Sequence, residues 1–262
     1  AISCCILWPK SPRCSGFPIT AACAAFLKGS RATVSNHWSH GIPVPEASKE
    51  IWPHRLVVVE GLIGVGKTSL ARKLAAAVGA ETVFEQPMEN PFLERFYKSP
   101  KAAAFPAQLH FLFQRARQLA ALRQHDMFAP LRIADYMLEK DRLFARVVLD
   151  DEEYKLYEQV YNRLALDAPI PDLVVFLQAP VDALLQRIDK RGIAYEKYID
   201  AAYLGRLGEA YTRFFHQYTA SPLLIVNTAE IDPANNSHDF DDLFEMIRQT
   251  RSGRHYVNPV RR

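Results

Sequence analysis

Cysteine, long apolar runs and an excess of one charge are all scarce in this chain of 262 residues. The four cysteines, Cys4, Cys5, Cys14 and Cys23, lie near the beginning, which excludes a disulfide framework, a cysteine nucleophile and a cysteine metal site from the remainder. No uninterrupted apolar run approaches the roughly 18 residues of a membrane-spanning helix. The formal net charge of +3 does not support a nucleic-acid-binding surface, which would need clustered Lys and Arg.

Residues 1–54 lack the features of a folded domain. No Asp or Glu occurs up to Pro45, and no helical or strand period persists. Three interpretations stay open: sequence translated upstream of the true start, which fits a first residue that is Ala; an organellar transit peptide, because such peptides are basic and poor in acids; or a disordered native extension. We therefore expect an extension at 1–54, a folded body at 55–250 and a C-terminal tail at 251–262. The cysteine-free body fits a reducing compartment, the cytoplasm, or a mitochondrion or plastid if the extension is a transit peptide.

Short apolar runs alternate with amphipathic stretches from Arg55 onward. Strands are expected at 56–60, 82–84, 131–134, 172–177 and 223–226, and helices at 67–78, about 106–124, 152–166, 181–190, 201–218 and 240–250. In the first helix Leu70, Leu74 and Val78 share one face, and Gly79 can cap the end. Strands that alternate with helices predict an α/β fold with a five-stranded parallel sheet covered on both faces.

A phosphate-binding loop follows the first expected strand. Residues 61–68 read Gly-Leu-Ile-Gly-Val-Gly-Lys-Thr and match G-x-x-x-x-G-K-[ST] between a strand and a helix. The glycines let backbone N–H groups surround phosphate oxygens, and the helix N-terminus adds unpaired donors. Lys67 would reach the outer phosphates of ATP, and the Thr68 hydroxyl would ligate Mg²⁺. The expected nucleotide-binding residues are Gly61, Gly64, Gly66, Lys67, Thr68 and Ser69.

The residues after the other strands narrow the class of reaction. A switch GTPase needs D-x-x-G and N-K-x-D, but Asp135 is followed by Tyr-Met-Leu and Asn227 by Thr-Ala-Glu. A motor ATPase needs an acid directly after its strand-end Asp, where this chain has Tyr136. A small-molecule kinase is therefore favoured. Glu85, which follows the second strand, could accept the proton of an attacking hydroxyl, although a solvated loop acid is the simpler interpretation of a lone Glu85.

Further motifs follow in order along the chain. They are Glu85-Gln86-Pro87, Tyr97-Lys98-Ser99-Pro100, Phe105-Pro106-Ala107-Gln108 with Arg115 seven residues later, an arginine-rich segment from Arg187 to Gly192, and Glu196 before Tyr203-Leu204. Over residues 55–250 this series resembles the deoxyribonucleoside kinase family, most of all its bacterial deoxyadenosine/deoxyguanosine kinase branch. The resemblance implies a P-loop kinase fold with a helical lid, nucleotide salvage by ATP-dependent phosphorylation of a deoxyribonucleoside 5′-hydroxyl, and a homodimer without nucleic-acid or membrane partners.

The resemblance also implies a role for each matching residue around the acceptor. Glu85 would be the general base for the 5′-hydroxyl. Tyr97 and Glu196 would hold the 3′-hydroxyl, with Tyr97 crowding the 2′ position. Gln108 would pair with the base edge, because an amide donates and accepts at once. Arg115 would position Glu85 or the base.

The lid would complete the catalytic residues. Arg187 and Arg191 would clamp the phosphates as the lid closes and, with Lys67, stabilise the charge of the transition state. Without the resemblance, Tyr97 would read as a packed tyrosine and Gln108 as an ordinary helix-surface residue.

One motif departs from the family pattern. Many members carry Glu-Arg-Ser or Asp-Arg-Ser after the third strand, where this chain has Asp135 and Tyr136. Asp135 can serve Mg²⁺, but a tyrosine cannot replace the charge of an arginine. Lys140 and Arg142 are both candidates for that charge, and Asp141 is the candidate for an acidic group that reads the base.

Two other functions remain as alternatives. A nucleoside monophosphate kinase of the thymidylate kinase type shares the loop and the lid but needs an arginine for the acceptor phosphate, which Arg95 or Arg115 could supply. Glu85 argues against it, because a hydroxyl acceptor needs a base and a phosphate does not. A nucleotide-binding module without turnover is a minor alternative. Gln108 can serve an adenine edge, and cytosine offers its amide a similar pair. The resemblance to the bacterial purine-specific branch favours the purines, deoxyadenosine first.

Overall fold

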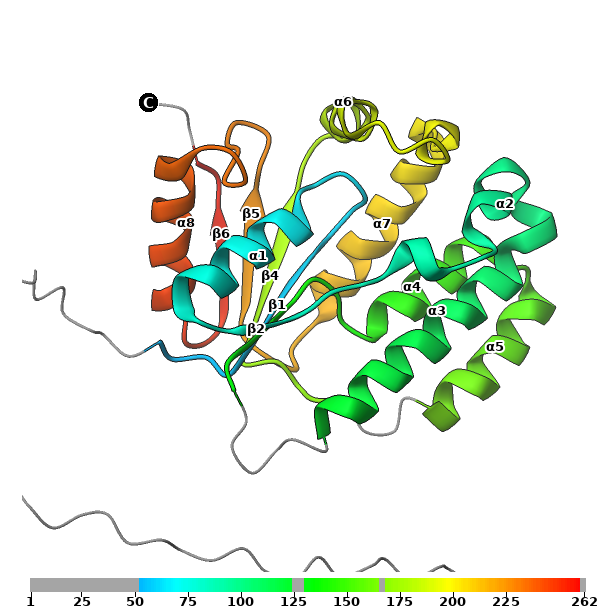
Figure 1. Ribbon diagram of the computed structural model, residues 1–262, viewed down its shortest axis with the longest axis horizontal. Helices are drawn as coiled ribbons and strands as arrows, with labels where there is room; N and C mark the ends of the chain where they lie inside the picture. The colour runs from blue at the N-terminus through cyan, green and yellow to red at the C-terminus, as the bar shows by residue number, and fades with distance from the viewer. Residues whose placement is uncertain (1–51, 124–129, 165–167, 260–262) are drawn as a thin grey trace, which may run out of the picture. The chain divides into compact units, whose positions relative to one another are not determined.

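The structure, a computed structural model, describes residues 52–123, 130–164 and 168–259 (Figure 1). By its contacts the chain divides into two units, 1–49 and 50–262, and the described residues all belong to the second. The expected extension up to residue 51 lies outside the described residues. So do the expected last residues of two helices, at 124 and at 165–166.

A six-stranded sheet with the order β2-β3-β1-β4-β5-β6 forms the centre of the second unit (Figure 1). Its strands are β1 (Leu56–Gly61), β2 (Glu81–Val83), β3 (Arg132–Ala134), β4 (Leu173–Gln178), β5 (Leu223–Asn227) and β6 (Arg254–Val257). All neighbouring strands are parallel, and Val58 of β1 lies opposite Ala134 of β3 and Val174 of β4. Helices cover both faces of such a sheet, which is why β1 and β4 are almost uniformly apolar and buried.

The expectation of five strands is wrong, because the segment expected as a C-terminal tail supplies a sixth. β6 pairs with β5, with His255 opposite Leu224 and Tyr256 opposite Ile225. It is an edge strand, and Tyr256 is exposed. An edge strand can remain polar, so no apolar run marks it in the sequence.

Helices pack on the two faces of the sheet and around its strand ends. They are α1 (Lys67–Val78), α2 (Leu93–Lys98), α3 (Pro100–Arg123), α4 (Glu139–Val148), α5 (Asp151–Leu164), α6 (Val181–Arg191), α7 (Ala201–Gln217) and α8 (Ser237–Gln249), with short 3₁₀ turns η1 (Pro87–Glu89) and η3 (Glu196–Tyr198). Figure 1 shows α8 on one side of the sheet and α7 on the other, with α3 and α5 further out beside α4. In the described parts of the chain, no helix has the length and apolar character needed to cross a membrane.

Helix α3 begins six residues before its expected start. Pro100 occupies the first helical position, where no backbone N–H is needed, and Pro106 lies inside the helix. Placing the helix start at Pro106 was therefore wrong. The earlier start gives α3 the buried residues Ala103 and Ala107, which pack with Leu93 of α2 in a second apolar cluster.

Residues before Arg55 also belong to the folded unit. The Trp52 ring stacks on Phe244 of α8, with ring centroids 5.4 Å apart. His54 is buried, and its Nε2 lies 3.1 Å from the carbonyl oxygen of Ile247. The described structure therefore includes at least three residues that sequence analysis assigned to the extension.

Candidate active site

The phosphate-binding loop joins β1 to α1, and its three glycines, Gly61, Gly64 and Gly66, all have positive φ. Gly61 has φ +147°, and a Cβ there would collide with the backbone carbonyl oxygen of Leu177 in the neighbouring strand β4. Gly66 has φ +102° but faces open space. The loop therefore needs glycine at Gly61 for both space and conformation, and at Gly66 for conformation alone.

Lys67 begins α1, where its ammonium group lies within the loop. Its Nζ donates to the carbonyl oxygen of Leu62 at 3.0 Å. Burial, followed by repulsion from Lys140, lowers the pKa of Lys67 to about 8. A bound phosphate would stabilise the charged form of Lys67, because it places an anion next to the ammonium group.

Asp135 connects the loop with the end of β2. It follows β3 directly, its Oδ1 accepts the backbone N–H of Glu85 at 2.8 Å, and its Oδ2 accepts the hydroxyl of Thr68. Mg²⁺ in phosphate sites takes one or two protein oxygens and completes its coordination with water and phosphate. The oxygens of Thr68 and Asp135 fit that requirement. In the described residues no group of three or more His, Cys, Asp and Glu side chains forms a self-contained metal site.

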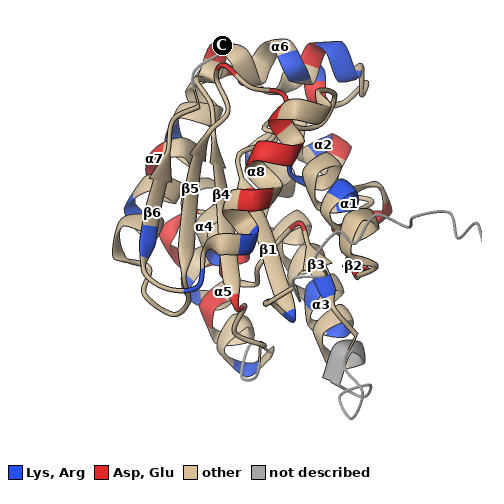
Figure 2. Ribbon diagram, turned by 90° about the vertical axis from the view of Figure 1, so that its left-hand side faces the viewer, with Lys and Arg blue, Asp and Glu red and all other residues tan. Residues whose placement is uncertain are grey.

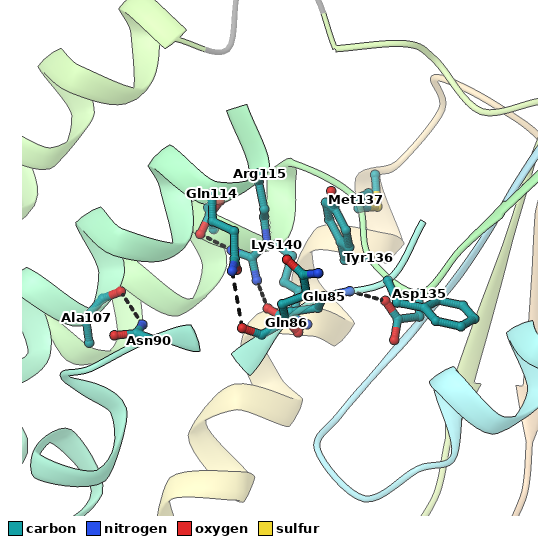
Figure 3. A network of polar contacts seen from close by, with 12 residues as sticks. Glu85, Gln86, Asn90, Ala107, Gln114, Arg115, Asp135, Tyr136, Met137 and Lys140 are labelled. Carbon is teal, nitrogen blue, oxygen red and sulfur yellow. Dashed lines mark hydrogen bonds and ion pairs between the residues drawn. The ribbon is translucent and has the colours of Figure 1, made fainter. Parts of the chain in front are cut away.

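Two cations converge on the Glu85 carboxylate, as Figure 3 shows. Lys140 Nζ lies 2.6 Å from Oε2, and the guanidinium of Arg115 bonds to Oε1. Burial alone would raise the pKa of Glu85, but attraction to Lys140 and Arg115 outweighs it and holds the pKa at about 2. Glu85 is therefore ionised at any ordinary pH.

Arg115 links Glu85 to a second carboxylate deeper in the protein. Arg115 is 3% exposed and also bonds to Asp141, which is fully buried on α4. Its guanidinium lies 5.1 Å from the ring centroid of Phe111 and 5.4 Å from that of Tyr136. Burial raises the pKa of Asp141 to about 7 despite attraction to Arg115. Two carboxylates and two aromatic rings therefore fix the position of the Arg115 guanidinium.

One cavity collects most of the expected substrate residues. Its lining includes Gly64, Lys67, Thr68, Glu85, Tyr97, Gln108, Arg115, Asp135, Lys140, Arg191, Tyr195, Glu196 and Tyr203. These residues come from the segments after β1, β2 and β3, from the start of α1, from α2, α3 and α4, and from the lid segment that runs from the end of α6 into α7. The carboxyl ends of the strands thus face the cavity, as in other open parallel sheets.

Aromatic rings and one amide line the part of the cavity away from the phosphate loop. Tyr97 stacks on Tyr195 with centroids 5.8 Å apart and planes 6° from parallel, and Tyr203 meets Tyr97 edge-on. The Gln108 side chain is 3% exposed. None of the described residues makes a hydrogen bond to its amide, so it is available to a ligand.

The lid arginines occupy two different positions. Arg191 pairs with Glu196, with Nη2 at 2.7 Å from both carboxylate oxygens. Arg187 lies in a second cavity, where it donates to the carbonyl oxygen of Thr228 at 2.7 Å. Gly66, Ser69, Lys190 and Asn235 also line that cavity, and Gly64 and Arg191 line both. Figure 2 shows basic residues on α6, the helix that carries Arg187, Lys190 and Arg191.

The sequence left open whether Lys140 or Arg142 supplies the charge that Tyr136 lacks. The structure brings Lys140 into the cavity, whereas Arg142 lies near the surface with Nη2 2.6 Å from Glu158. Tyr195 also lines the cavity, and no motif marked it. Asp141, the candidate base reader, does not line the cavity and instead bonds to Arg115.

Known proteins share both the sequence pattern and the fold. The family model described as deoxynucleoside kinase matches residues 57–251. A deoxyguanosine kinase of Bacillus subtilis (strain 168) is 33% identical over 199 residues, which cover 74% of this chain and 96% of the relative. A deoxyadenosine kinase of Dictyostelium discoideum is 29% identical over 213 residues, 78% of this chain and 82% of the relative. The structure of deoxyadenosine kinase from M. mycoides with bound dATP has a TM-score of 0.63 at 25% identity, covering 74% of this chain and 100% of that one.

Proposed function

The chain belongs to the deoxynucleoside kinase family, and we propose that it transfers the γ-phosphoryl group of ATP to the 5′-hydroxyl of a purine deoxyribonucleoside. The observation that carries this proposal is the position of Glu85. Its ionised carboxylate lines the same cavity as Lys67, Thr68 and Asp135. A base is thus next to the phosphate loop, where an acceptor hydroxyl has to lose its proton.

The reacting centre would work mainly through position and charge. The 5′-oxygen forms a bond to the γ-phosphorus, the bond from that phosphorus to the β,γ-bridging oxygen breaks, and ADP leaves with that bond pair. Glu85 takes the proton of the hydroxyl. Lys67 would hold the outer phosphates, and Thr68 and Asp135 would hold Mg²⁺, which would offset the negative charge of the phosphates.

The lid pair would change partners when substrates bind. Glu196 is engaged by Arg191 in the structure. If Arg191 turned toward the phosphates beside Arg187, Glu196 would be released for the 3′-hydroxyl of the sugar. Tyr97, whose ring is fixed by stacking on Tyr195, would crowd the 2′ position and disfavour ribose.

Gln108 supports adenine as the preferred base. Its amide can accept from an exocyclic amino group and donate to a ring nitrogen, and both adenine and cytosine offer that pair. The similarity to a deoxyguanosine kinase and a deoxyadenosine kinase favours the purine. Guanine would need an acidic acceptor, but Asp141 is fully buried and bonded to Arg115. We therefore place deoxyadenosine before deoxyguanosine.

The monophosphate kinase alternative loses support because neither candidate arginine is free to bind an acceptor phosphate in the cavity. Arg95 is exposed and does not line the cavity. In the described chain, the arginines that line the cavity are Arg115 and Arg191, and each is paired with a carboxylate. Arg191 is the arginine proposed above for the donor phosphates, so an acceptor phosphate would have to draw Arg115 away from both Glu85 and Asp141.

Two exposed apolar side chains on α3 and α5 bear on the oligomeric state. Phe113 on α3 and Leu156 on α5 are 48% and 51% exposed on neighbouring helices, which suits burial against a second copy of the chain. We infer a homodimer in the cytoplasm, and light scattering of the purified protein would measure the assembly.

The test of this function is a substrate panel with a matched pair of variants. ATP-dependent phosphorylation is measured with deoxyadenosine, deoxyguanosine, deoxycytidine, thymidine, adenosine and dTMP, with and without Mg²⁺. We expect the highest kcat/KM for deoxyadenosine, and a deficit of about 5–150-fold for bases that leave the buried amide unpaired. Glu85→Gln should lower kcat by roughly 10²–10⁴-fold. Glu81→Gln, on the exposed strand β2, should leave kcat within about twofold.

Different results would overturn different parts of the proposal. Turnover of dTMP without turnover of any nucleoside would establish the monophosphate kinase alternative. A tenfold or greater preference for thymidine or deoxycytidine would refute the choice of purine alone. A Glu85→Gln variant that changes only KM would make Glu85 a binding residue rather than the base.

A further inference from the structure

The place of Lys140 is unfavourable for a lysine on structural grounds alone. Its side chain is only about 5% exposed, and burying an ammonium group carries a large desolvation penalty. It lies in the first turn of α4, where the helix dipole repels a cation. It also repels Lys67 across the cavity. The ion pair with Glu85 offsets these costs, so Lys140 is held at the cavity by the carboxylate that is the proposed base.

The contacts of Lys140 point toward the reacting atoms. Its Nζ lies 2.6 Å from Glu85 Oε2 and 5.6 Å from the centroid of the Phe144 ring, which lines the same cavity. Arg115 holds Oε1 of Glu85, which leaves Oε2 to accept a hydroxyl beside Lys140. A hydroxyl that donates to Oε2 would lie about 2.7 Å from it, so the attacking oxygen would be within about 5 Å of the ammonium group.

Tyr136 occupies the position where the family pattern places an arginine, and it does not face the cavity. Its hydroxyl donates to Gln118, and its ring lies beneath the guanidinium of Arg115. It lines a small apolar hollow formed with Leu56 and Pro171 instead. The positive charge that is absent after Asp135 is therefore supplied four residues further along the chain, from a different element.

We propose that Lys140 is a catalytic residue that holds Glu85 toward the acceptor hydroxyl and donates to an oxygen of the phosphoryl group as it is transferred. This inference rests on the proposed kinase function and adds a residue to its machinery. No bond to Lys140 forms or breaks. Its ammonium group keeps its protons and stabilises charge on the phosphoryl oxygens while the hydroxyl proton passes to Glu85.

The test uses Lys140→Met, which keeps the length of the side chain and removes the charge, with Lys140→Arg as the conservative variant. Lys140→Met should lower kcat on the order of 10²-fold while the KM for ATP changes only a few-fold. Lys140→Arg should recover at least about tenfold of that loss. Arg142→Met is the matched control, two residues along the same helix and outside the cavity, and should retain kcat within about twofold.

A double variant separates contact with the phosphoryl group from action through Glu85. If Lys140 acts only by holding Glu85, then Lys140→Met adds no loss in a Glu85→Gln background. We expect a further loss of about tenfold or more there, because the phosphoryl contact is independent of the carboxylate. No further loss would overturn the phosphoryl contact.

Wild-type activity separates the failure of this inference from the failure of the proposed function. A wild-type protein that phosphorylates no nucleoside would refute the proposed function. An active wild type with a near-normal kcat in Lys140→Met would overturn the role of Lys140 alone. A lower melting temperature with an unchanged kcat would make Lys140 structural and would equally overturn the proposal.

Discussion

At the scale of the residue, the two lysines on the phosphate side of the cavity affect each other's charge. Burial and repulsion from Lys140 set the pKa of Lys67 at about 8, so Lys67 carries most of its charge at pH 7 and loses it as the pH rises past 8. ATP binds the charged form, because only an ammonium group neutralises the outer phosphates. Binding must therefore take up protons above pH 8.

The first prediction follows from this titration. The Kd for ATP should rise on the order of tenfold between pH 7 and pH 9.5, measured by titration calorimetry in two buffers of different ionisation enthalpy. In Lys140→Met the rise should begin at a higher pH, because the repulsion that lowers the pKa of Lys67 is gone. Lys67→Met should bind ATP weakly with no such rise, and a rise that persists in this control would assign it to another group.

At the scale of the element, the loop between β1 and α1 depends on glycine in two different ways. At Gly61 a side chain would be strained by the positive φ and would also collide with the backbone of β4. At Gly66 only the positive φ opposes a side chain. Alanine at Gly61 would thus meet both a collision and backbone strain, whereas alanine at Gly66 would meet backbone strain alone.

The second prediction compares alanine at these two glycines. Gly61→Ala should lower the free energy of unfolding by about 3 kcal/mol or more and abolish ATP binding, because β1 and β4 must move apart. Gly66→Ala should cost about 1–2 kcal/mol, the strain of a left-handed alanine. Urea denaturation followed by circular dichroism measures both, and equal losses would show that the collision with β4 is relieved cheaply.

Elements with regular apolar spacing could be predicted from the sequence, whereas polar elements could not. Helix α1 and strands β1 and β4 are close to expectation, because nearly all of their buried positions are apolar. Helix α4 was not expected, because two of its buried residues, Lys140 and Asp141, are charged and interrupt the period. Strand β6 was not expected either, because its exposed edge needs no apolar run. The elements missed here include one that carries site residues.

At the scale of the whole molecule, the site is assembled from contacts between distant segments. Glu85 and Lys140 are 55 residues apart, and Arg115 and Asp141 are 26 apart. The resemblance to the deoxyribonucleoside kinase family implied that Glu85, Gln108 and Glu196 surround one substrate, and in the structure all three line one cavity. Spacing could not choose between Lys140 and Arg142, because that choice depends on which face of α4 meets the cavity. It also could not show that Arg187 lies in a second cavity, which depends on the position of α6 against β5 and its following loop.

The last prediction concerns where the folded unit begins. Trp52 and His54 fix the segment before β1 to α8, through the stack on Phe244 and the contact with the carbonyl of Ile247. A chain that starts at Ile51 should keep the activity and melting temperature of the full chain. A chain that starts at Arg55 should lose on the order of 2–3 kcal/mol of unfolding free energy, from one aromatic stack and one buried hydrogen bond.

The pH dependence of this loss identifies its source. Burial lowers the pKa of His54 below its ordinary value of 6.5, so protonation of His54 favours the unfolded chain. The stability that His54 contributes is therefore present above pH 6.5 and is lost as the pH falls through its lowered pKa in the folded protein. The difference between the two truncated chains should shrink on acidification, as measured by urea denaturation at pH 7.5 and pH 5. Equal stability of the two chains at pH 7.5 would place the start of the folded unit at Arg55, and an unfolded chain from Ile51 would show that earlier residues are required.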